Sequence, residues 1–171
     1  MPDMNLTGLR ELYDHHAWAM DRLLARAREV SPGDAAEAAR PDGLSLRDTL
    51  AHIVSAEGNW LRRFQVRERY GSFRPDSVAG VATGWIGLQA DFRVFLAGLE
   101  AADLDRPIVR DPHPRDRGTL RAGITHVIMH GAQHTAEAAE LLTRLGHSPG
   151  QLDYMEFLDL RERDLPFYRP S

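Results

Sequence analysis

The strongest constraint on the fold is a helical repeat of apolar residues in four segments, each of roughly 20 residues. Apolar side chains that recur every three or four residues share one face of an α-helix, which folding then buries. The repeat predicts helices over about Thr7–Val30, from Ser45 to about Arg67, over about Val81–Leu99, and from Thr119 to Leu145. Such helices with short or medium connections favour an all-α four-helix bundle.

Residues that start or stop helices support these boundaries. Ser45 is a good N-cap, and Asp48 three residues later completes a capping-box pattern. The run Ser31-Pro-Gly breaks the first helix. Gly146 is expected to take the left-handed conformation that ends the fourth helix, with Pro149 shortly after it.

The remaining segments predict connections and one short helix. Ala35–Leu44 is expected to be a loop with at most one weak turn, and Tyr154–Arg163 to be a short extra C-terminal helix. Pro107–Gly118 has no helical period and predicts either a short hairpin or an irregular loop. A crossover in this third connection would change the simple up-down order, which the sequence leaves open. We expect residues 1–171 to form a single domain.

Composition excludes several classes of function. The net charge of −4 argues against nucleic acid as a partner, because binding its backbone needs an excess of cations. No apolar run approaches the roughly 20 residues that cross a membrane, and no secretory signal is visible, so a cytoplasmic location is expected. The chain has no Cys and no Lys, which excludes thiolate metal ligands and Schiff-base catalysis. Any metal must therefore be held by His, Asp or Glu.

The fourth predicted helix carries His126, His130 and His134 at successive four-residue spacing. Two histidines at this spacing lie on one helical face and can chelate one ion. All three cannot do so together, because the outer two lie about 12 Å apart along the axis. One pair is expected to bind; we prefer His130 with His134, although spacing alone barely separates it from His126 with His130.

A further ligand has to come from another helix, and His52 is the candidate. It lies in the second predicted helix among Leu50, Ile53 and Val54. If the second and fourth helices pack side by side, His52 can face His130 and His134. Three neutral imidazoles would leave coordination positions open for water or substrate. Taken alone, His52 is more typical of a hydrogen-bonded core histidine.

Other residues are candidates to support these ligands. Ligating imidazoles usually donate their second N–H to a carboxylate or carbonyl. Glu137 lies close to the face of His130, one turn beyond His134, and His16 falls on the apolar stripe of the first helix. His126, if it is not itself a ligand, is a third candidate for this supporting role. Glu57 is well off the face of His52 and ranks lower. The remaining candidates have other expected roles: Ser55 and Asn59 line the pocket, and His113 and His147 lie in surface loops.

Two stretches carry a resemblance to a known family. Residues 50–61, Leu-Ala-His-Ile-Val-Ser-Ala-Glu-Gly-Asn-Trp-Leu, and residues 125–134, Thr-His-Val-Ile-Met-His-Gly-Ala-Gln-His, resemble the second and fourth helices of the DinB/YfiT-like metal-binding bundles. The resemblance implies a divalent metal, commonly zinc, nickel or manganese, held by His52, His130 and His134. It departs at Gln133, where family members often have another histidine.

The resemblance also implies a range of functions. Similar members are often homodimers, and some are metal-dependent transferases that use a low-molecular-weight thiol such as bacillithiol or mycothiol. A metal-dependent thiol S-transferase or hydrolase acting on a small molecule is therefore the first hypothesis. The second is a non-catalytic metal-binding or stress-response module, and the third is a helical interaction protein without metal.

Overall fold

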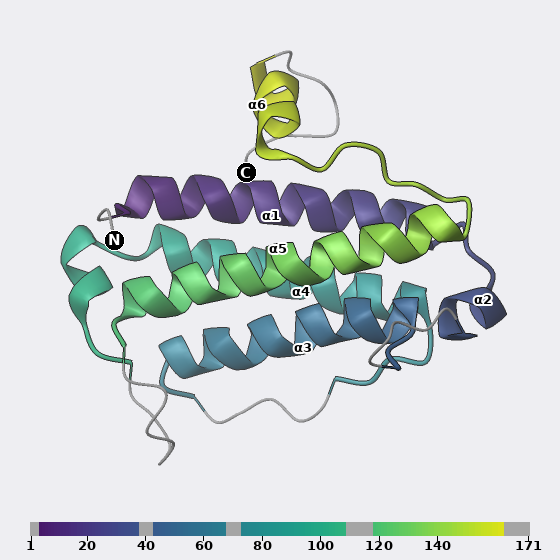
Figure 1. Ribbon diagram of the computed structural model, residues 1–171. Helices are drawn as coiled ribbons and strands as arrows, with labels where there is room; N and C mark the ends of the chain where they lie inside the picture. Colours follow the sequence, from purple (N-terminus) through teal and green to yellow (C-terminus); the bar gives the residue numbers. More distant parts are fainter. Residues whose placement is uncertain (1–3, 38–42, 68–72, 109–117, 163–171) are drawn as a thin grey trace.

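The computed structural model describes residues 4–37, 43–67, 73–108 and 118–162. Its helices are α1 (Leu6–Ala27), α2 (Pro32–Glu37), α3 (Leu46–Phe64), α4 (Val78–Ala97), the 3₁₀ helix η1 (Ala101–Asp105), α5 (Leu120–Arg144) and α6 (Tyr154–Glu162). The long helices α1, α3, α4 and α5 pack side by side, and α6 lies against α1 (Figure 1). No strand occurs in the described ranges. The predicted all-α bundle with a short C-terminal helix is confirmed.

Polar residues cap each long helix at its N-terminus. In each case the side chain of the residue before the helix accepts a hydrogen bond from a backbone N–H three residues later, which satisfies a donor with no partner inside the helix. These caps are Asn5, Ser45, Ser77 and Thr119. Gly146 has φ of +81°, as predicted for the residue that follows α5.

The start of α2 corrects the sequence prediction. Pro32, expected only to break the first helix, occupies the first position of a new one, where its fixed φ suits the helix and its missing N–H costs nothing. Ser31 caps this helix by accepting from the Asp34 N–H at 3.2 Å. Ala35–Glu37, expected to lie in a loop, therefore belong to α2, and the next five residues of that expected loop lie outside the described residues. Other predicted helix ends differ from the observed ones by up to three residues.

The order of helix directions is not simple up-down. In Figure 1, α1 and α5 run one way along the bundle, and α3 and α4 run the other way. The connection between α3 and α4 therefore joins opposite ends of the bundle, whereas α4 leads through η1 to the adjacent start of α5. The crossover therefore lies between α3 and α4, one connection before Pro107–Gly118, for which the sequence had left this question open.

The described ends of the third connection pair with each other. Pro107 and Thr119 form an isolated antiparallel bridge, and the Ile108 N–H donates to the Gly118 carbonyl at 2.9 Å. This pairing fits the base of a hairpin. His113 and most of the connection lie outside the described residues.

Two large apolar clusters fill the bundle, with a layer of buried polar residues between them, and a third, smaller cluster of Trp18, Ala19 and Phe157 joins α6 to α1. One large cluster contains Met20, Leu50 and Trp85, and the other contains Tyr13, Phe64 and Phe92. The polar layer comes from the middle of α1, α3 and α5 and consists of His16, Glu57 and Thr135. Among the described helices, none is both long and apolar enough to cross a membrane.

Candidate metal centre

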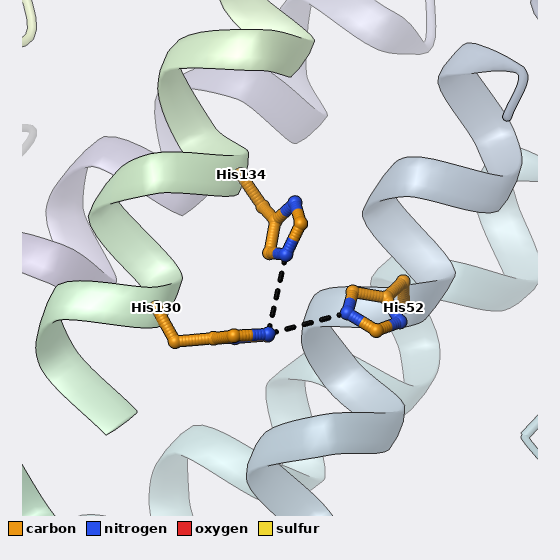
Figure 2. Close-up of side chains that lie close together, drawn as sticks. All are labelled: His52, His130 and His134. Atoms are coloured by element: carbon orange, nitrogen blue, oxygen red, sulfur yellow. Dashed lines mark hydrogen bonds between the residues drawn. The ribbon is translucent and has the colours of Figure 1, made fainter. Parts of the chain in front are cut away.

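Three histidine rings from two helices converge between α3 and α5 (Figure 2). His130 and His134 lie one turn apart on α5, and the antiparallel neighbour α3 brings His52 to the same point. The Nε2 atom of His130 lies 3.2 Å from Nε2 of His52 and 3.2 Å from Nε2 of His134. The structure therefore brings together the histidines that the sequence grouped as one site.

The spacing of these nitrogens fits coordination of one ion. Zinc–nitrogen bonds of about 2.0–2.1 Å at tetrahedral angles place two ligand nitrogens about 3.3 Å apart. Each histidine of the set offers one nitrogen, and all of these atoms lie within 4.8 Å of one another. The three histidines can therefore hold a metal ion, and an all-nitrogen set suits a borderline divalent metal.

The protonation state of His130 is compatible with a metal ligand. Burial and then the neighbouring imidazoles of His134 and His52 lower the pKa of His130 to about 4, so its ring is neutral at pH 7. A neutral imidazole has one N–H and one lone pair. The Nε2 atom of His130 contacts two nitrogens and has at most one proton to donate. Where the Nε2 atoms of all three rings carry no proton, one shared cation would satisfy all three nitrogens.

Glu137 fixes the ring of His134. Its Oε2 atom lies 2.5 Å from Nδ1 of His134, and its Oε1 atom accepts from the Gln133 amide at 3.2 Å. When Nδ1 of His134 carries the proton, it donates to this carboxylate, and the lone pair on Nε2 faces the other two histidines. This is the usual arrangement behind a ligating imidazole. Gln133, where the sequence departs from the family pattern, thus holds the carboxylate.

Glu137→Gln is expected to weaken Zn²⁺ binding by about 10–100-fold, because a neutral amide accepts less strongly from the His134 N–H. Competition with a chromophoric chelator would measure the affinity. Glu140→Gln, an exposed glutamate on the same helix that pairs with Arg144, is the matched control and should leave affinity unchanged. Equal affinities for both variants would contradict a supporting role for Glu137.

His126 lies outside the group of three. It is exposed, and its ring lies 5.0 Å from that of Trp60 and 5.7 Å from that of His130, measured between centroids. The guanidinium carbon of Arg63 lies over the Trp60 ring, 4.5 Å from its centroid. His126 therefore lies beside the candidate site, and His52 faces the pair of His130 and His134 instead.

His16 lies beneath the site, inside the bundle. Its Nε2 atom lies 2.5 Å from Oε1 of Glu57, and both side chains are at most 2% exposed. The ring packs against the backbone of Gly131, where an added Cβ would lie only 2.4 Å from the ring. Burial and the charge of Glu57 raise the pKa of Tyr13, which neighbours this pair. His16 thus contacts the helix that carries His130, but its hydrogen bond is to Glu57.

Glu57 is the residue that sequence reasoning ranked too low. It was compared with the face of His52, whereas it belongs to the buried stripe of α3 together with Val54 and Leu61. A carboxylate on an apolar stripe has to find a partner inside the protein. That signal, matched with His16 on the apolar stripe of α1, would have predicted the pair.

The remaining candidates, and His15 on α1, lie elsewhere. Asn59 donates to the Ser55 carbonyl at 2.9 Å, and Ser55 lines a cavity toward α4. His15 contacts the Leu152 carbonyl at 2.9 Å, where burial lowers its pKa. The Nδ1 atom of His147 lies 3.4 Å from Oε2 of Glu29.

These features define the class of protein: a helical bundle with a three-histidine cluster able to hold one metal ion on its α3–α5 face. The sequence model of the DinB family matches residues 1–165. The chain therefore belongs to the DinB family, as the resemblance predicted. No curated protein matches the sequence.

Proposed function

We propose that the chain, as one domain, binds a divalent metal ion through His52, His130 and His134. The observation that carries this proposal is the convergence of three Nε2 atoms, with 3.2 Å between His130 and each of its neighbours. The fixed ring of His134 and the neutral ring of His130 support it. Zinc, nickel and manganese are the candidate ions.

The site is suited to an external ligand. His52 is exposed, and a three-nitrogen set leaves coordination positions open. A divalent ion held there lowers the pKa of a coordinated water or thiol and so supplies a nucleophile near neutral pH. The chain has no Cys, so a thiol has to come from a small molecule.

The finer proposal is a metal-dependent thiol S-transferase. Both carboxylate oxygens of Glu137 already accept hydrogen bonds from His134 and Gln133, which leaves this glutamate poorly placed to act as a base. A thiol, with a pKa near 8.5, needs less help to ionise than water does. This difference favours a thiol substrate over hydrolysis.

Two measurements test the proposal in sequence. Protein purified without an affinity tag is expected to contain about one equivalent of metal, with anomalous scattering at that metal's edge between the three histidines. Metal-loaded protein is then expected to accelerate consumption of a small thiol by monochlorobimane. Absence of any bound metal after loading would overturn the site.

The rate of thiol consumption distinguishes the proposed transferase from a non-catalytic metal-binding module. Equal thiol consumption by the metal-loaded protein and by His130→Ala would discard the transferase. Stable metal binding without turnover would favour the non-catalytic metal-binding module. A homodimer and a cytoplasmic location remain predictions; light scattering would test the dimer.

A further inference from the structure

A cavity of about 320 Å³ lies between α3 and α4, separate from the histidine cluster. This volume is at the lower end of the range for small-ligand sites, about 300–1,000 Å³. Glycines on both helices, Gly58, Gly84 and Gly87, are among the residues that line it. A Cβ added at Gly87 would meet nothing within 4 Å. None of the three clustered histidines is among the residues that line the cavity.

The lining combines an apolar surface with a cationic rim. The apolar part includes Leu61, Phe73 and Leu88, and Phe73 lies so close to Gly84 that an added Cβ would be 2.4 Å from its ring. Among the described residues that line the cavity, Arg62 and Arg67 are cationic and Asp91 is acidic. Two arginines beside one aspartate in this described lining favour an anion, because guanidinium groups pair well with carboxylate, sulfonate or phosphate.

A strained turn brings these two arginines to the same cavity. Val66, directly after α3, has φ of +56°, which is unfavourable for a β-branched residue. The Arg67 N–H donates to the Arg62 carbonyl at 2.8 Å, and the Val66 N–H donates to the Arg63 carbonyl at 3.1 Å. This is the helix ending in which glycine is usual. Strain of this kind gathers at ligand-binding positions.

We propose that this cavity binds a small amphiphilic organic anion. The apolar body of the ligand, an aromatic ring or short aliphatic chain, packs on Leu61, Phe73 and Leu88. Its acidic group lies at the rim and pairs with Arg62 and Arg67. Binding here does not require the metal ion, since the cavity and the histidine cluster use different faces of α3.

The first test fills the cavity. The probe is 8-anilinonaphthalene-1-sulfonate, an aromatic anion whose fluorescence rises in an apolar site. Gly87→Leu is expected to weaken its binding at least tenfold, because the new side chain enters open space. Ala90→Leu, an exposed position on α4 that does not line the cavity, is the matched control and should bind as the unaltered protein does. Equal binding by both variants overturns the proposal.

The second test removes the cation. Arg62→Gln is expected to weaken the anionic probe about tenfold and to leave N-phenyl-1-naphthylamine, its neutral analogue, unchanged. Arg63→Gln, which removes the same charge on the Trp60 side of α3, should affect neither probe. Unchanged binding of the anion to Arg62→Gln overturns the rim assignment. In NMR spectra the probe is expected to shift the amides of Gly84 and Gly87; shifts confined to α1 and α5 would overturn the location.

Discussion

His130→Ala is expected to weaken Zn²⁺ binding by roughly a hundredfold to a thousandfold. His130 is the central ligand, because its Nε2 atom contacts those of both His52 and His134. Zinc sites with four ligands contribute about 10–16 kcal/mol, or about 2.5–4 kcal/mol per ligand. At about 1.4 kcal/mol per tenfold change, one lost ligand gives this range. Isothermal titration against a competing chelator would measure it.

His126→Ala is the matched control for that experiment. It removes an imidazole from the same helix, one turn before His130, and its ring is not part of the cluster. Its affinity for Zn²⁺ should stay within about twofold of the unaltered protein. If His126→Ala lost as much affinity as His130→Ala, the alternative pairing of His126 with His130 would replace the present assignment.

His16→Leu is expected to lower the free energy of unfolding by about 3–5 kcal/mol, because it leaves the buried carboxyl group of Glu57 without its partner. Unfolding in urea would measure this loss. The double variant His16→Leu with Glu57→Leu removes both polar groups and is expected to recover most of the stability. A double variant less stable than the single one would show that the pair itself is not what His16 contributes.

The sequence predicted the four long helices because each of them buries an apolar stripe and begins at a capping residue such as Ser45. It could not predict that α3 and α4 run in the same direction, since the apolar repeat of a helix is identical in both directions. Pro32 misled the interpretation for a related reason. Proline disrupts the interior of a helix but is tolerated in its first turn. The sequence around Pro32 therefore did not show whether it only ends α1 or also begins α2.

The ligand cluster was predictable in part. Four-residue spacing placed His130 and His134 on one face of α5, but the spacing of His126 is the same. Only the packing of α3 against α5 shows which pair His52 meets. The pairing of Glu57 with His16 escaped because each residue was judged on its own helix, whereas their contact joins residues that are 41 positions apart.

The glycine at position 131 has a consequence for the evenly spaced histidines of α5. A slide of α3 by one helical turn, about 5.4 Å, would bring His52 opposite His126 and His130, an equally spaced pair. The histidines alone therefore permit two registers. The His16 ring fits only where α5 lacks a side chain, and one turn away it would meet Val127 or Thr135. Glu57 holds the His16 ring to α3, so the space at Gly131 permits only one register of α3 against α5.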